Sequence, residues 1–206
     1  MLDVVITHYV EPWFICKKLF LSLEMQRIVN WDEIKVTVVN DGGMRLPEEE
    51  LNRLSFPVGQ IDIPKSGVSA ARNAGMKHGS EPWIMFCDCD DCFVSIYALD
   101  EILTAIRRHA NSRDMVWARC LTEFGRIVVL ISDPKQMVFI HGKAFRRQFL
   151  LDAGIRFDEG MNYGEDTKFV QDVQAATDMI EEVPYDAYVW IRRGGSVTTG
   201  RKNDQD

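Results

Sequence analysis

The sequence has 206 residues, of which 46% are hydrophobic and 27% are charged, and its formal net charge is −7. These values indicate one soluble globular domain with a substantial core, and the negative charge argues against nucleic acid or an anionic membrane surface as the main partner. No apolar run is long enough to cross a bilayer, and the first residues lack the basic and apolar regions of a signal peptide, so we expect a cytosolic protein without stable membrane insertion.

The first half of the chain is predicted to alternate strands with helices. Short apolar and β-branched runs bounded by turn residues predict strands at 3–8, 35–40 and 58–63. The segments that follow them predict helices at 11–27, 47–54 and 66–79. Ser66 is expected to cap the last of these helices, and its small residues should let it lie close to the sheet.

The stretch from Trp83 to Asp91 begins as a buried strand and ends in the three carboxylates of Asp88, Asp90 and Asp91. Open α/β sheets bind ligands at the carboxyl ends of such strands. Crowded carboxylates repel one another, and a hard divalent cation such as Mg²⁺ or Mn²⁺ would offset that repulsion. The alternative is a solvated acidic turn that caps the next helix. Nearby cysteines are expected to be free thiols, because their total of five is odd and no export signal precedes them.

The second half of the chain mixes strand and helix signals. The predicted elements are an amphipathic helix over 96–109, a hairpin of strands at 114–122 and 126–131, a short strand at 137–140, a helix over 144–152, a helix capped by Asn162 and a strand at 185–191. The basic, glycine-rich segment after them either closes over an anionic ligand or is a frayed tail. This order indicates the α/β class, with a mixed, mainly parallel sheet covered by helices on both faces and a single domain over 1–206.

Other polar residues are predicted at the same sheet edge as the acidic cluster. Thr7 and Tyr9 fall at the carboxyl end of the first strand, and Asp41 follows the second strand in a turn sequence, where it could be simply a turn residue. Arg72 lies near a helix start, where phosphate binds readily, although a surface arginine is the simpler interpretation. In the later helix, Glu165 can form a capping box with Asn162.

Five short motifs in this order resemble the family 2 glycosyltransferases of the GT-A fold. They are Ile-Thr-His-Tyr with Glu11, Val-Asn-Asp-Gly-Gly at 39–43, Gly-Val-Ser-Ala-Ala-Arg-Asn-Ala-Gly at 67–75, Phe-Cys-Asp-Cys-Asp-Asp at 86–91 and Gly-Glu-Asp at 164–166. The resemblance runs from Val4 to about Thr199. It implies a nucleotide-binding half over about 1–92, an acceptor-side half over about 93–191 and a flexible basic tail over 192–206.

The resemblance implies a binding site for the nucleotide-sugar donor. Thr7 and Tyr9 would flank the base, usually uracil, and Asp41 would hydrogen-bond it, with Glu11 in the same set. Arg72 would lie near the base and the diphosphate. Asp91 would hold the donor sugar or support its neighbours.

The resemblance also implies a metal and a catalytic base. Asp88 and Asp90 match an Asp-x-Asp motif, in which the first contacts ribose, sugar or metal and the second binds Mn²⁺ or Mg²⁺. Asp166 would be the catalytic base. Glu165 would orient the acceptor or cap the helix.

Three positions on the metal and acceptor sides allow more than one interpretation. Val10 stands where the family usually has Asn, which puts the loop after the first strand in doubt. Family members often place a histidine from the C-terminal segment on the metal, and here His141 or no protein group would fill that place; a structural histidine is the alternative. Lys143 and Trp190 belong either to the acceptor side or to the packing.

The function expected from the resemblance is an inverting glycosyltransferase. A nucleotide sugar, usually a UDP-sugar, would donate its sugar to an unidentified hydroxyl, with Asp166 removing the proton. One alternative is a nucleotidyltransferase that makes nucleotide sugars, although the sequence lacks the glycine-rich basic loop that such enzymes carry after the first strand. Another alternative, motivated by Val10, is a non-catalytic nucleotide-sugar-binding subunit. A homo-oligomer is possible on this sequence.

Overall fold

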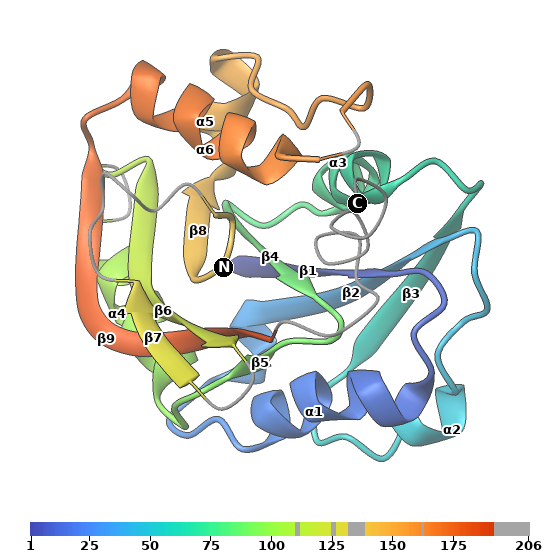
Figure 1. Ribbon diagram of the computed structural model, residues 1–206. Helices are drawn as coiled ribbons and strands as arrows, with labels where there is room; N and C mark the ends of the chain where they lie inside the picture. The colour runs from blue at the N-terminus through green and yellow to red at the C-terminus, as the bar shows by residue number, and fades with distance from the viewer. Residues whose placement is uncertain (110–111, 125–126, 132–138, 162, 192–206) are drawn as a thin grey trace.

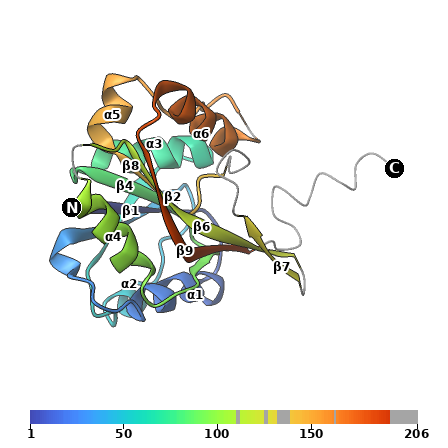
Figure 2. The same ribbon diagram turned by 90° about the vertical axis from the view of Figure 1, so that its left-hand side faces the viewer.

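A computed structural model of the chain describes residues 1–109, 112–124, 127–131, 139–161 and 163–191 (Figure 1). Nine strands form one sheet in the order β3-β2-β1-β4-β8-β6-β9-β5, and β7 pairs with β6 outside this path. Helices cover both faces of the sheet (Figures 1 and 2). The α/β class expected from the sequence is therefore confirmed. None of the helices in these described ranges is long and apolar enough to cross a membrane.

The first half of the sheet is parallel throughout. Its strands are β1 (Leu2–His8), β2 (Ile34–Asp41), β3 (Val58–Ile63) and β4 (Trp83–Asp88). Every residue of β1 is buried, because helices cover both of its faces, and this burial explains its unbroken apolar sequence. In register, Thr7 lies opposite Asp88 and His8 lies opposite Asn40, so the polar ends of three strands meet at one edge.

The second half of the sheet is mixed. Its strands are β5 (Cys92–Phe93), β6 (Met115–Phe124), β7 (Ile127–Ile131), β8 (Lys143–Arg146) and β9 (Ile180–Ile191). Strand β8 pairs antiparallel with both β4 and β6, and so joins the two halves. Strand β6 runs parallel to β9 and forms the expected hairpin with β7.

The helices divide between the two faces. On one face lie α1 (Trp13–Glu24), α2 (Glu48–Leu51) and α4 (Ala98–Arg108), and on the other lie α3 (Val68–His78), α5 (Arg147–Asp152) and α6 (Glu165–Ala176) (Figures 1 and 2). A short 3₁₀ turn, η1 (Trp31–Glu33), precedes β2. Each face has its own apolar core, one built on α1 and α4 and the other on α5 and α6.

Several local predictions are wrong. Residues 144–146 are a strand and not the start of a helix, because Ala144 and Phe145 are buried in the gap between β4 and β6. The last strand begins at Ile180, earlier than expected, since its first residues pair with β6. The predicted helix 11–27 is observed only over Trp13–Glu24.

Two predicted helix caps are also wrong. Gly67, at φ +94°, precedes α3 in place of Ser66, and Gly164, at φ +75°, precedes α6 in place of Asn162. In both cases the turn needs a positive φ that glycine adopts without strain. Of the strand predicted at 137–140, residues 137–138 lie outside the described part, and residues 139–140 form a bend. Asn162 and the tail 192–206 also lie outside it.

Candidate active site at the carboxyl edge of the parallel strands

Asp88, at the end of β4, is the residue on which the other groups converge. The Thr7 hydroxyl donates a hydrogen bond to Asp88 Oδ1 at 3.1 Å, as the β1–β4 register requires. Arg72 Nη2 donates to the same oxygen at 2.9 Å. The other carboxylate oxygen, Oδ2, lies 3.2 Å from His141 Nε2. Asp88 therefore joins β1, α3 and the segment before β8 at one point.

Arg72 is a buried bridge between two carboxylates. Besides its bond to Asp88, Nη1 donates to Glu165 Oε1 at 2.9 Å, across 93 residues of sequence. The guanidinium also lies over the Phe157 ring, 5.3 Å from its centroid. Glu165 is the first residue of α6 and makes this ion pair; the capping box predicted with Asn162 involves a residue outside the described part of the chain. Arg72 is thus not a surface arginine.

Close packing of α3 places Arg72 in the site. A Cβ on Gly75 would approach Val5 Cγ1 to 2.3 Å, so only glycine allows the helix to lie this near β1. Ala71 and Ser69 are buried in the same interface. The small residues noted in the sequence therefore have the expected packing role, and they explain how a long arginine side chain can reach the strand ends.

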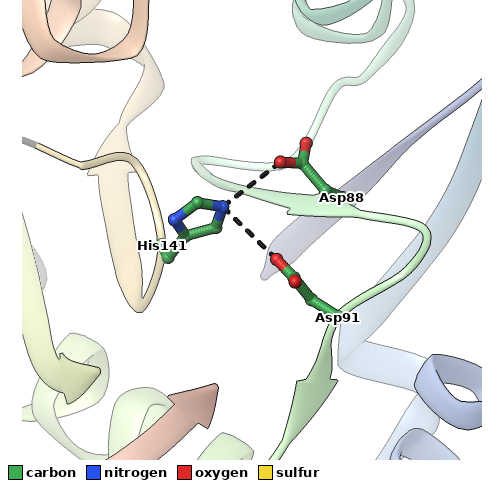
Figure 3. A group of neighbouring side chains, drawn as sticks. All are labelled: Asp88, Asp91 and His141. Carbon is green, nitrogen blue, oxygen red and sulfur yellow. Dashed lines mark hydrogen bonds and ion pairs between the residues drawn. The ribbon is translucent and has the colours of Figure 1, made fainter. Parts of the chain in front are cut away.

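Asp88, Asp91 and His141 form a compact group (Figure 3). One potential ligand atom from each lies within 4.8 Å of the others. His141 Nε2 is 3.3 Å from Asp91 Oδ2, which is fully buried and accepts no hydrogen bond from the described residues. The other oxygen, Asp91 Oδ1, accepts from the backbone N–H of Ile191 at 2.9 Å. An orphaned buried carboxylate oxygen facing a histidine and a second carboxylate fits a divalent cation.

The pKa values in this group support the same interpretation. Burial acts to raise the pKa of Asp88, but Arg72 and His141 outweigh it and hold that pKa well below its usual value. Burial raises the pKa of Asp91 to about 8, and Asp88 adds to this shift. Burial also disfavours protonated His141, yet its bond to Asp88 leaves its pKa raised. Asp91 carries a negative charge at a high energetic cost here, which a bound cation would reduce.

Residues 139–142, the histidine loop, hold His141 in place. The Lys143 ammonium is buried and donates to the carbonyl oxygen of Phe139 at 2.5 Å, closing the loop on itself. Gly142 has φ +71°, and its carbonyl accepts from the Ala118 N–H at 2.9 Å. Burial lowers the pKa of Lys143 to about 7. The contacts of Lys143 are therefore with the loop that carries the candidate metal ligand.

Aromatic residues of β9 also support His141; the sequence interpretation missed Tyr188 and left Trp190 between the acceptor side and the packing. The rings of Tyr188 and Trp190 stack on the imidazole, with centroids 5.4 and 5.9 Å away. The two residues are separated by one position, so they project from the same side of the strand. That alternation was the available signal, but it does not indicate which loop the rings would contact.

The predicted base-binding residues form a second group beside the first. Asp41 is buried, and its two oxygens accept from the backbone N–H groups of Ser66 at 2.6 Å and Gly67 at 2.9 Å. The Lys65 ammonium lies 3.9 Å from Asp41 and also above the ring of Tyr9. Asp41 thereby orders the turn into α3. It is therefore more than a residue of its own turn, because it holds the start of a helix from another part of the chain.

Glu11 links the loop after β1 to the acidic segment. Its Oε2 accepts from the Tyr9 N–H at 3.1 Å and from the Cys89 thiol at 3.5 Å. His8 is buried and joins Asn40 Oδ1 and the Glu11 carbonyl, each at 2.9 Å. All five cysteines are free thiols, as expected.

Asp90 and Asp166 lie at the margin of the site. Asp90 is half-buried in the turn after β4 and is not among the three grouped ligands, so its metal role stays a prediction. Asp166 is half-buried and accepts from the Thr167 N–H at 2.8 Å. Its charge helps to raise the pKa of Arg72 and partly opposes the lowering of the pKa of Lys143 by burial. A separate open hollow of about 690 Å³ lies between the loop 153–160 and the outer side of α6, away from these groups.

A parallel half-sheet with an acid-rich carboxyl edge, extended by a mixed half-sheet, defines an α/β protein whose candidate ligand site lies at that edge. The particular family follows from direct comparison. The family model described as "Glycosyl transferase family 2" matches residues 3–161, and the chain belongs to that family.

Curated relatives and solved structures agree with this assignment. The minor teichoic acid biosynthesis proteins GgaB and GgaA of Bacillus subtilis (strain 168) are 26% and 28% identical over 175 and 158 residues, which are 74% and 67% of this chain. The matched regions are only 19% of GgaB and 35% of GgaA. The structure of S. aureus TarS residues 1–349 in complex with UDP-GlcNAc superposes with a TM-score of 0.79 at 21% identity, over 97% of this chain and 60% of that one. The same TarS segment with UDP gives a TM-score of 0.76 at 21% identity, over 94% of this chain and 61% of that one.

Proposed function

We propose that this chain is a metal-dependent, inverting glycosyltransferase domain that transfers a sugar from a UDP-sugar to an acceptor hydroxyl. The observation that carries the proposal is the meeting of Thr7, Arg72, Asp88, Asp91 and His141 at one sheet edge. These groups come from four separate parts of the chain. Their convergence supports a common ligand, because acidic turns that were merely solvated would not be expected to meet at a buried arginine and a buried histidine.

The divalent ion would be held by Asp88, Asp91 and His141, with Asp90 as a further candidate. When bound, such an ion supplies positive charge to the diphosphate that leaves the sugar. Arg72 contributes a fixed positive charge beside the same edge, and its two carboxylate partners keep it oriented. The carboxylate ligands suit both Mn²⁺ and Mg²⁺.

The acceptor proton would be removed by Asp166 at the start of α6. Asp166 is the second residue of α6, is half-buried, and its charge acts on the buried Arg72, which supports a location beside the candidate site. Glu165 is held by Arg72 and would position the helix start, leaving Asp166 as the acid free to face the acceptor. A general base of this kind is typically worth about 10² to 10⁴ in rate.

The donor assignment rests on two lines of support. Asp41, Tyr9 and Lys65 lie together beside the metal group, where the base and the diphosphate would bind. TarS, which shares the fold, has been solved with UDP and with UDP-GlcNAc. UDP-GlcNAc is therefore the first donor to test, and a teichoic acid is the first acceptor, because GgaA and GgaB are named for teichoic acid biosynthesis.

The experiment measures UDP release from a panel of UDP-sugars with Mn²⁺, with Mg²⁺ and with EDTA, in the presence and absence of teichoic acid. We expect metal-dependent turnover of one donor. Incubation with a sugar phosphate and UTP, followed by a pyrophosphate assay, tests the nucleotidyltransferase alternative and should give no product. Donor binding without turnover across all acceptors would favour the non-catalytic subunit.

The base is tested by Asp166→Asn, with Asp172→Asn on the same helix as the matched control. Asp172 is half-buried and pairs only with Lys168, at 2.6 Å, among the contacts of the described residues. We expect Asp166→Asn to bind donor normally, by donor-induced thermal stabilisation, and to lose at least about 100-fold in turnover. The Asp172→Asn control should keep normal donor binding and normal turnover. Near-normal turnover in Asp166→Asn would remove the base assignment.

A further inference from the structure

Helix α1 is apolar on both of its sides. Its inner side packs into the core through buried residues, namely Cys16, Leu19, Phe20 and Leu23. Its outer side carries Phe14, Leu21 and Met25, which are 72%, 46% and 56% exposed. These three are spaced seven and four residues apart, so they form one stripe along the helix. The helix therefore buries one apolar stripe in the core and exposes a second, and within the described residues nothing covers the exposed stripe.

The stripe continues past the end of the helix. Ile28 is 75% exposed and has φ +61°, a left-handed conformation that is strained for a β-branched residue. The N–H of Arg27 donates to the carbonyl of Ile96 at 2.7 Å, which brings the end of α1 against the segment before α4. That segment exposes further apolar side chains, at Val94, Ile96 and Tyr97. We call Phe14, Leu21, Met25, Ile28, Val94, Ile96 and Tyr97 the α1 surface.

Basic side chains without ion-pair partners flank the α1 surface. Lys17, Lys18 and Arg27 are exposed, and none of them makes an ion pair within the described parts of the chain. The acids that border α1 are already engaged: Glu24 accepts from the Ser55 N–H at 2.9 Å, and Glu50 pairs with Arg53 at 2.8 Å. A hydrogen bond does not cancel the charge of Glu24, but Lys17, Lys18 and Arg27 outnumber it, so the charge along α1 is positive although the whole chain is negative. At the other end of the α1 surface, Asp100 and Glu101 lie in the first turn of α4.

We propose that the α1 surface docks on an anionic lipid bilayer. Phe14, Leu21 and Met25 enter the boundary between headgroups and acyl chains, and the flanking lysines contact lipid phosphates. An amphipathic ridge with large apolar side chains and adjacent cations is the pattern of peripheral membrane helices. The net charge of −7 does not oppose this, because charges more than about 8 Å away are largely screened at physiological salt.

The charge pattern distinguishes a bilayer from a second copy of the chain. Self-association through this surface would bring Lys17 and Lys18 of both copies into one interface, where like charges repel. An anionic bilayer instead offers a flat apolar layer bordered by phosphates, which complements both parts of the surface. Because α1 begins four residues after Tyr9, docking would also place the candidate donor site next to the bilayer.

The test is co-sedimentation of the 206-residue chain with vesicles of phosphatidylcholine, with and without phosphatidylglycerol. It needs no nucleotide sugar, so it is independent of the proposed transferase activity. We expect binding to the anionic vesicles that weakens with salt, and at least about tenfold weaker binding for both Phe14→Ser/Leu21→Ser/Met25→Ser and Lys17→Glu/Lys18→Glu. Leu151→Ser/Met179→Ser is the matched control, since these residues are 60% and 55% exposed elsewhere, and it should bind normally.

Three results would overturn the proposal. They are failure of the wild-type chain to sediment with anionic vesicles, equal loss of binding in the control, and unchanged binding in both α1 variants. Sedimentation velocity adds a separate arm: a concentration-dependent dimer that the serine variant abolishes would assign the surface to self-association. Circular dichroism and thermal unfolding verify that each variant is folded. If the serine variant is unfolded, the lysine variant still tests the proposal.

Discussion

Replacing Arg72 by methionine should destabilise the protein strongly. The guanidinium is buried and donates at 2.9 Å to both Asp88 and Glu165. Removing one partner of a buried ion pair costs about 3–5 kcal/mol, because an uncompensated charge remains. For a domain of this size that loss lowers the melting temperature by roughly 6–20 °C. The free energy of unfolding is measured by urea denaturation, followed by tryptophan fluorescence.

A double-mutant cycle with Glu165→Gln tests the bridge itself. If Arg72 and Glu165 stabilise the fold through their contact, the double variant should be about 0.5–3 kcal/mol more stable than the two single losses predict when added. Arg147→Met is the matched control, because Arg147 also pairs with a mostly buried acid, Asp3, outside the candidate site. Both arginine variants should lose stability, but only Arg72→Met should change the stabilisation by Mn²⁺, and it should increase it, because a competing cation beside Asp88 is removed.

Two outcomes would refute this reasoning. A cost below about 1 kcal/mol for Arg72→Met would mean that the arginine is effectively at the surface. Additive losses in the cycle would mean that Glu165 acts only at the start of its helix, as the capping interpretation of the sequence held. Either result would also weaken the proposed function, since Arg72 supplies its fixed positive charge.

Two further predictions concern the metal group. In metal-free protein, Asp91 has a folded-state pKa of about 8, above the value near 4 of the unfolded chain, so folded Asp91 retains a proton that the unfolded chain releases. Its contribution to stability is therefore complete below about pH 4 and is lost as the pH rises through about 8; thermal unfolding across this range should show the fall, Mn²⁺ should offset it, and Asp91→Asn should flatten it. A flat wild-type profile would contradict the burial of this charge. Lys143→Met removes the bond to the Phe139 carbonyl that closes the histidine loop, so Mn²⁺ affinity measured by calorimetry should fall about tenfold, whereas Lys168→Met, on the exposed side of α6, should leave it unchanged. Equal affinity in both lysine variants would show that backbone contacts alone hold the loop.

Local patterns predicted the parallel half of the fold well. Strands β1 to β4 are short apolar runs in which neighbouring residues determine both the strand and its end, so the order of residues was enough to assign Asp41 and Asp88 to one edge. Parallel pairing then forces those ends together. The family resemblance added roles for these residues, but the edge itself followed from the order of strands and helices.

The second half depended on contacts that periodicity does not encode. Residues 144–146 carry an apolar pattern that suits a helix or a strand, and they form a strand only because β4 and β6 leave a gap that Ala144 and Phe145 fill. Gly67 and Gly164 replaced the expected polar caps for a similar reason. The chain must turn through a positive φ at those points to bring each helix to the sheet edge.

The sequence by itself determined which acidic residues lie at the sheet edge and the order of the strands and helices that carry them. Only the tertiary structure decided their partners: Arg72 pairs with a carboxylate 93 residues away, and His141 meets Asp88 across 53 residues. Such pairings form when the two half-sheets pack through β8. A buried charge is stable only when an opposite charge lies beside it, so the packing determines which groups pair. No local pattern specifies that choice.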